Sequence, residues 1–139
     1  IGLLMNLPKE QHPNKFLDVE KEFNRFSSRL DHFMSLTNVF VIAEGGIGTC
    51  LELFYSLQLI QVKHTCNVPI ILMGDMWPDF IKWLEKWPLK KGLIDKIDLE
   101  VLFLAKDSNE AMRMINQAYL EYKKGHKNFC LNYDKYKLY

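Results

Sequence analysis

The fold of this protein is decided by a strand–glycine–helix stretch, NVFVIAEGGIGTCLE at residues 38–52. The run from 38 to 43 is continuously apolar after its first residue and predicts a buried strand. A helix is expected from Thr49 to about Lys63. The glycines between them let the backbone turn tightly and let a ligand approach it closely. A glycine turn between a buried strand and a helix is typical of a phosphate-binding loop.

The expected helix start supplies the groups that bind an anion. Its first amides have no partner inside the helix, and the helix dipole adds partial positive charge there. We therefore predict a phosphate site made by consecutive residues, namely Gly45, Gly46, Ile47, Gly48 and Thr49. The Thr49 hydroxyl is expected to cap the helix and to bind the anion. Glu52 has two interpretations, a functional carboxylate beside the ligand or an ordinary acid in the first helical turn.

Apolar runs and helical patterns alternate along the rest of the chain. Further strands are expected at 1–7, 67–73 and 99–104, and further helices at 77–84 and from caps at Ser27 or Ser28 and at Asp107 or Ser108. Residues 19–23 fit either a strand or a helix. Apolar strands separated by helices imply a parallel sheet covered on both faces. We predict an α/β fold, a Rossmann-like doubly wound sheet in one domain (1–126), followed by a tail (127–139).

Composition narrows the class of protein. A chain of 139 residues with 48% hydrophobic and 25% charged residues suits one globular domain. The net charge of +1 gives no general case for a nucleic-acid partner or an anionic membrane. No apolar run approaches the roughly 20 residues that a membrane-spanning helix needs.

Cysteines and histidines carry two further predictions. Cys50, Cys66 and Cys130 are odd in number and show no paired spacing, which predicts reduced thiols in a cytoplasmic protein. No histidine is paired with a cysteine or an acid at metal-ligand spacing, so no metal site is predicted.

Arg29 and the glycine segment together resemble the LOG family, also called the possible lysine decarboxylases. The family signature is an Arg-Lys pair followed, further along the chain, by Pro-Gly-Gly-x-Gly-Thr-x-x-Glu. Arg29 matches the arginine, and the second part is matched by Gly45-Gly46, Gly48-Thr49 and Glu52. The opening LPKEQHPN at 7–14 is similar to a segment of the longer LOG-like subgroup. The resemblance covers residues 1 to about 124.

Members of the LOG family are Rossmann-like dimers that cleave the N-glycosidic bond of nucleoside 5′-monophosphates, such as AMP, to free base and ribose 5-phosphate. The resemblance implies a phosphoribohydrolase that needs no metal or organic cofactor and forms a homodimer or higher oligomer. It implies that residues 45–49 hold the 5′-phosphate, while Arg29 and Glu52 are catalytic. Glu52 would lie near the ribose, and Arg29 would contact the phosphate or the base. Glu10 and Asn14 become possible substrate-loop residues.

Two residues depart from the family signature. Glu44 replaces the proline, and its carboxylate either repels phosphate or points to solvent. Leu30 replaces the lysine, which removes a positive charge. The N-terminal glycine-rich segment of the family is not matched, so the chain is expected to lack the N-terminal part of the fold. The alternative function is therefore a catalytically inactive nucleotide-binding sensor or carrier module of the same fold.

Some of these residues also have a purely structural interpretation. Arg29, without the signature, fits a solvated helix residue paired with an acid. The helical spacing of Trp77, Phe80, Trp83 and Trp87 predicts packing in the core or at a subunit contact rather than a platform for a base.

Overall fold

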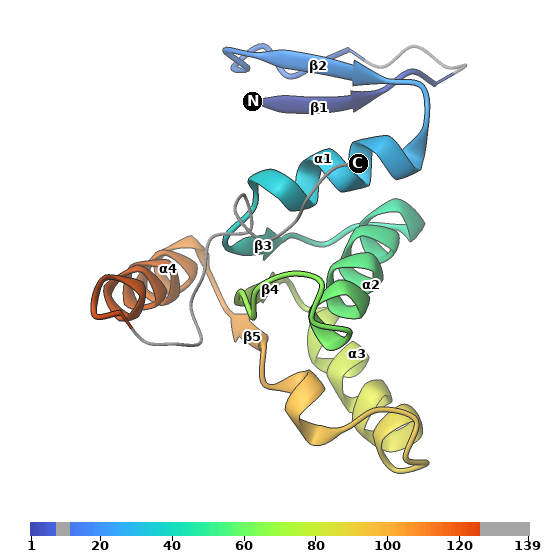
Figure 1. Ribbon diagram of the computed structural model, residues 1–139, viewed down its shortest axis with the longest axis vertical. Coiled ribbons are helices and arrows are strands. Elements are labelled where there is room, and N and C mark those ends of the chain that lie inside the picture. The colour runs from blue at the N-terminus through green and yellow to red at the C-terminus, as the bar shows by residue number, and fades with distance from the viewer. Residues whose placement is uncertain (8–11, 126–139) are drawn as a thin grey trace.

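The computed structural model describes residues 1–7 and 12–125, in which strands and helices alternate along the chain (Figure 1). The elements in order are β1 (Gly2–Met5), β2 (Glu20–Phe23), α1 (Phe26–Leu36), β3 (Phe40–Ile42), α2 (Ile47–Gln61), β4 (Ile70–Met73), α3 (Trp77–Leu84), a π-helical turn (Glu85–Leu89), a 3₁₀ turn (Lys96–Leu99), β5 (Leu102–Ala105) and α4 (Ser108–Lys123). The predicted tail at 127–139 lies outside the described residues.

All pairs of described strands are parallel, but they form two sheets rather than the single sheet that the sequence predicts. One sheet pairs β1 with β2, and the other has the order β3-β4-β5. Helix α1 joins them: it packs against β1 and β2 and then contacts β3 through the Phe33 and Phe40 rings, whose centroids are 5.6 Å apart. Figure 1 shows α1 between the two sheets. The prediction of a Rossmann-like α/β fold with parallel strands is confirmed, and the described strands are divided between two sheets.

The main core lies on one face of the three-stranded sheet. Alternate residues point to opposite faces of a strand. Ile70 and Leu72 of β4 therefore pack on the same side, together with Phe40 and Ile42 of β3. Helices α1, α2 and α3 cover this face with fully buried residues that include Met34, Leu53 and Trp77.

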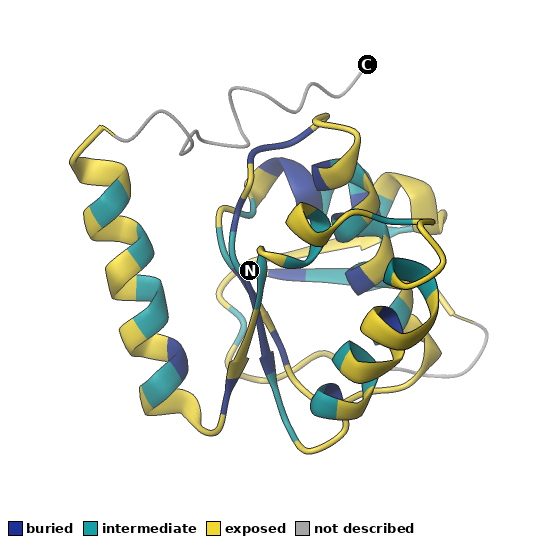
Figure 2. Ribbon diagram, turned by 90° about the horizontal axis from the view of Figure 1, so that it is seen from below, coloured by how far each residue is buried: buried dark blue, intermediate teal, exposed yellow. Residues whose placement is uncertain are grey.

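The opposite face of this sheet is covered by α4. Ile71 of β4 and Ala105 of β5 pack against Ala111 of α4, and all of them are buried. Helix α4 stands beside the sheet with most of its surface exposed or partly exposed (Figure 2). The prediction of helices on both faces is therefore confirmed for the three-stranded sheet.

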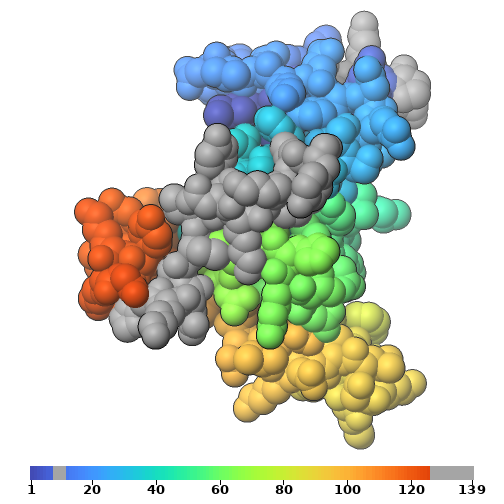
Figure 3. Space-filling view, viewed as in Figure 1, coloured from blue at the N-terminus to red at the C-terminus, as the bar shows by residue number. Residues whose placement is uncertain are grey.

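The space-filling view shows how this arrangement shapes the surface (Figure 3). Helix α4 projects on one side, and the segment from the end of α3 to the 3₁₀ turn projects below the sheet. The π-helical turn Glu85–Leu89 continues α3 and contains Pro88. Because proline has no N–H to donate, it disturbs the regular ladder of hydrogen bonds at this end of α3.

Several predicted boundaries need correction. The ambiguous segment 19–23 is strand β2. Helix α1 begins after an extended Arg25, so neither Ser27 nor Ser28 caps it, and the Ser28 hydroxyl donates to the Arg25 carbonyl instead. Helix α2 begins at Ile47, before Thr49. The predicted cap at Asp107 is confirmed, because its carboxylate accepts from the amide of Glu110.

The cysteines differ in state. Cys50 is a free thiol, whereas Cys66 is buried and disulfide-bonded. The prediction of reduced thiols is therefore wrong for Cys66. The odd number and irregular spacing of the cysteines do not determine whether a disulfide forms, since pairing depends on distances in the folded chain.

Candidate functional site

The glycine segment forms the connection from β3 to α2. Gly46 is the N-cap of α2 and has an extended backbone, with φ −93° and ψ −152°. Gly45 lies directly against Thr49: a Cβ atom at residue 45 would be 2.1 Å from the Thr49 Oγ1. The close approach of these two residues therefore requires glycine at position 45.

The sequence predicts that the Thr49 hydroxyl caps α2, and this prediction is wrong. Thr49 lies inside the first turn of the helix, and Gly46 provides no side chain for a cap. A threonine caps a helix only from the N-cap position, where its oxygen reaches the amides one turn ahead. The Thr49 hydroxyl instead packs beside Gly45, on the loop predicted to bind phosphate.

The helices that follow β3, β4 and β5 differ at their N-termini. At the start of α3, Glu44 Oε1 accepts from the amides of Asp75 at 2.6 Å and Met76 at 3.3 Å. At the start of α4, Asp107 accepts from the amide of Glu110 at 2.8 Å. Helix α2 has no side-chain cap and no acidic residue in its first turn. Among the described residues no carboxylate caps its first amides, which carry the positive end of the helix dipole.

Arg29 and Glu52 form an ion pair one and a half helical turns into α2. The Arg29 Nη1 lies 2.5 Å from the Glu52 Oε1, and their side chains are only 25% and 26% exposed. The Arg29 Nε donates to the Leu3 carbonyl of β1 at 2.7 Å. Because Glu52 lies in the second turn of α2, its interpretation as a capping acid is wrong. Arg29 does pair with an acid, but from a position that is mostly buried.

A second link between the same helices was missed by the sequence analysis. The Tyr55 hydroxyl donates to the Asp31 carboxylate at 2.6 Å. Glu52 and Tyr55 are three residues apart and therefore share one face of α2. In the sequence, this spacing indicates that the two side chains face the same neighbour. Their partners on α1 are identified only by the packing of α1 against α2.

Cavities open at the carboxyl edge of the three-stranded sheet. One, of about 170 Å³, is lined by Thr49 and Glu52 together with Glu44, Ser56 and the residues of β3. A neighbouring hollow of about 390 Å³ is lined by Glu44, the β4–α3 loop, Lys106 and Asp107. Ligands of open α/β sheets bind at this edge. The structure thus brings Thr49 and Glu52 to one cavity, and Arg29 holds Glu52 through an ion pair.

The two departures from the LOG signature have different environments. Glu44 is exposed, and its Oε1 accepts from the amides of Asp75 and Met76 at the start of α3. Leu30 is 5% exposed and is part of the buried interior. The position where the signature has a lysine therefore carries a core residue here.

The other predicted residues lie elsewhere or are not described. Asn14 is exposed, and its side-chain oxygen accepts from the amide of Phe16, which closes a local turn. Glu10 lies outside the described residues. Trp77 is buried in the core as predicted, whereas Trp83 and Trp87 are 48% and 45% exposed.

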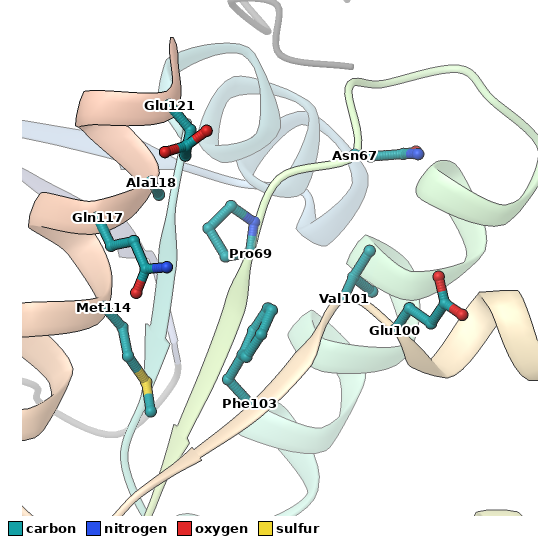
Figure 4. A pocket seen from close by; sticks show the side chains of 9 residues that line it. All are labelled: Asn67, Pro69, Glu100, Val101, Phe103, Met114, Gln117, Ala118 and Glu121. Carbon is teal, nitrogen blue, oxygen red and sulfur yellow. The ribbon is translucent and has the colours of Figure 1, made fainter. Parts of the chain in front are cut away.

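A larger cavity, of about 440 Å³, lies at the opposite end of the sheet (Figure 4). Pro69 and Val101 line it from the segments that enter β4 and β5, and Met114 and Ala118 line it from α4. None of the predicted site residues lines this cavity. Its walls are mainly apolar, whereas Thr49 and Glu52 line a cavity at the carboxyl edge.

Within 1–7 and 12–125, no three His, Cys, Asp or Glu side chains are grouped so that they could hold a metal ion. Within the same ranges, no helix combines the length and the apolar character needed to cross a membrane.

Comparison with known proteins identifies the family. The model of the family described as possible lysine decarboxylase matches residues 1–115. No curated protein matches the chain at a significant level of similarity. The matched range contains the glycine loop, Arg29 and Glu52. The chain therefore belongs to the possible lysine decarboxylase, or LOG, family of nucleotide-processing proteins.

Proposed function

We propose that the protein hydrolyses the N-glycosidic bond of nucleoside 5′-monophosphates to free base and ribose 5-phosphate. The observation that carries this proposal is the Arg29–Glu52 pair beside the uncapped start of α2. A positive helix end beside a cavity that a carboxylate lines suits a substrate that has a phosphate at one end and develops positive charge nearby.

In this proposal the 5′-phosphate binds the first amides of α2, at residues 45–49. Gly46 and Gly48 have open space where a side chain would begin, so the ligand can approach the backbone at both positions. The Thr49 hydroxyl, beside Gly45, supplies a further donor. The phosphate thereby anchors the ribose with its anomeric carbon toward Glu52.

Glu52 then acts on the reacting carbon. As the bond between C1′ and the base nitrogen breaks, its electron pair leaves with the base and positive charge develops on the ribose. The Glu52 carboxylate stabilises that charge and orients the water whose oxygen bonds to C1′. One proton of this water is lost, and the base takes up a proton. Arg29 holds the carboxylate in place through the 2.5 Å contact and contacts the phosphate or base of the bound substrate.

A second candidate is a nucleotide-binding module without turnover. It is favoured by Leu30, which places a buried apolar side chain where the signature has a lysine. It uses the same phosphate loop, and in it the Arg29–Glu52 pair would remain closed as a structural link between α1 and α2. The two candidates differ in one measurable property, the release of free base.

The test is incubation of the full chain with AMP, GMP, CMP and UMP, followed by chromatographic detection of base and ribose 5-phosphate. We expect base release from at least one nucleotide, and a fall in kcat of about 10²–10³ in Glu52→Gln, the size seen when one charge-stabilising group is removed. Glu85→Gln, an exposed residue outside the site, is the matched control. Tight nucleotide binding with no release of base would instead establish the binding module.

The proposal includes self-association as a homodimer or higher oligomer, which the LOG resemblance implies. Light scattering of the full chain during size-exclusion chromatography, with and without AMP, measures the oligomeric state. A monomer under both conditions would contradict this part and leave the hydrolase proposal to its own test.

A further inference from the structure

Glu44 connects two loops at the carboxyl edge of the three-stranded sheet. It belongs to the β3–α2 connection, immediately before Gly45, but its carboxylate reaches the β4–α3 connection. There the Oε1 accepts from the amides of Asp75 at 2.6 Å and Met76 at 3.3 Å. Glu44 also lines both cavities at this edge.

Gly74 accommodates this contact. Its φ of +134° is in a region that residues with a side chain rarely adopt. A Cβ atom at position 74 would lie 2.1 Å from the Glu44 Cγ and 2.7 Å from its Cδ. The β4–α3 turn is therefore shaped to receive the Glu44 side chain, both in backbone conformation and in space.

The contact also determines where the charge of Glu44 acts. Met76 is the N-cap of α3, so the carboxylate faces the positive end of that helix, where it accepts charge-assisted hydrogen bonds. The Oε1 atom is thus hydrogen-bonded to the start of α3, while Glu44 also lines the cavity that Thr49 and Glu52 line. The two sequence-based alternatives for Glu44, repulsion of phosphate or a side chain that points to solvent, did not include this contact.

Within the part of the chain that the structure describes, the other contacts of the phosphate loop are local ones. Gly45 and Gly46 are adjacent glycines, which lose more conformational freedom on ordering than other residues. Their position depends on the packing of Gly45 against Thr49 and on the bond from the Cys50 amide to the Gly46 carbonyl, at 3.0 Å. An anchor on the residue just before the glycines restricts the states available to this loop.

We propose that Glu44 is the positioning residue of the phosphate loop: by capping α3 it clamps the β3–α2 loop onto the β4–α3 loop and presents the first amides of α2 to phosphate. The role of the loop in holding a 5′-phosphate rests on the proposed function. The clamp itself rests only on the contacts of Glu44.

The experiment compares Glu44→Ala, Glu44→Gln and Gly74→Ala with the wild-type full chain, and uses Glu85→Ala as the exposed control. Amide hydrogen exchange is measured by NMR without ligand. The exchange rate of the Asp75 amide reports on the contact with Glu44, and that of the Cys50 amide reports on the phosphate loop. We expect exchange to become about tenfold faster at both amides in Glu44→Ala, the effect of losing one charge-assisted hydrogen bond. Gly74→Ala should show the same faster exchange as Glu44→Ala, because the added Cβ displaces the Glu44 side chain.

The Glu44→Gln variant distinguishes the hydrogen bonds of Glu44 from its negative charge. Glutamine keeps an oxygen that accepts from both amides, so Glu44→Gln should restore slow exchange at Cys50. In the base-release assay, Glu44→Ala should raise KM about tenfold with kcat changed less than about twofold, as expected when uniform binding is lost, and Glu44→Gln should recover most of KM. Inhibition by inorganic phosphate should weaken in parallel with KM.

Faster exchange at Asp75 with unchanged exchange at Cys50 would overturn the proposal, because Glu44 would then cap α3 without positioning the phosphate loop. A Glu44→Gln variant that matches Glu44→Ala in exchange, or one that binds phosphate more tightly than wild type, would likewise overturn it. Absence of base release from the wild-type chain would refute the proposed hydrolase alone, since the exchange measurement needs no substrate.

Discussion

Arg29 and Glu52, 23 positions apart in the sequence, are joined by a 2.5 Å contact between Nη1 and Oε1. The same arginine donates from Nε to the carbonyl of Leu3. One side chain of α1 thereby connects β1 in the two-stranded sheet with α2 beside the three-stranded sheet. The position of the proposed catalytic carboxylate thus depends on how the two sheets meet across α1.

Replacing Arg29 with lysine should destabilise the protein, because a single ammonium group cannot reproduce the two contacts made by separate guanidinium nitrogens. We expect the free energy of unfolding to fall by about 1–3 kcal/mol, the range for hydrogen bonds of a charged, partly buried group. Thermal and urea unfolding measure the change. Arg113→Lys is the control, since Arg113 is 69% exposed and lies 3.8 Å from its acidic partner. Equal stability of the two variants would show that Arg29 is not a structural link.

Gly48→Ala should separate stability from ligand binding. No atom lies within 4 Å of the place where its Cβ would be, and the residue is inside α2. Alanine in a helix is favoured over glycine by roughly 0.5–1 kcal/mol, so unfolding should need more free energy. The methyl group should nevertheless weaken inhibition by inorganic phosphate, because it occupies the space where the anion approaches the backbone.

Gly45→Ala should have the opposite effect on stability. Its Cβ would lie 2.1 Å from the Thr49 Oγ1 and 2.7 Å from the Thr49 Cβ, so the start of α2 must shift. We expect a loss of about 1–3 kcal/mol, the usual cost of overpacking. Similar stability changes in Gly45→Ala and Gly48→Ala would contradict the described geometry of the loop.

Tyr55→Phe tests the second link between α1 and α2. It removes the 2.6 Å hydrogen bond to the Asp31 carboxylate and leaves the ring in place. The expected loss is about 1–2 kcal/mol of unfolding free energy. Tyr119→Phe is a matched control on α4, where the tyrosine is 53% exposed. An unchanged melting temperature for Tyr55→Phe would mean that α1 and α2 are held together without this bond.

Leu53→Ala tests the core that supports the site. Leu53 lies next to Glu52 on α2 and is completely buried. Truncation should cost about 2–5 kcal/mol through lost burial and the cavity left behind. Leu51→Ala changes a residue of α2 that is 42% exposed and should cost much less. Denaturant unfolding followed by circular dichroism compares the two variants.

Much of the local structure could be predicted because periodicity and turn residues act over short distances. The apolar run before Gly45 is β3, the cap at Asp107 starts α4, and the helix at 77–84 has its predicted bounds. The sequence predicts that α2 starts at Thr49, whereas the helix starts at Ile47, since a sequence shows which residues can cap a helix but not which peptide groups have helical conformation.

The candidate site likewise combines local features that the sequence predicts with long-range contacts that it does not predict. The sequence by itself determined the family, the parallel α/β class, and a glycine loop with an arginine and an acid at separate positions. Only the tertiary structure decided that Arg29 holds Glu52, that Glu44 caps α3, and that Cys66 is disulfide-bonded. The physical reason is range: backbone propensities act between near neighbours, whereas a salt bridge or a cap across loops exists only when packing brings distant segments within a few ångströms.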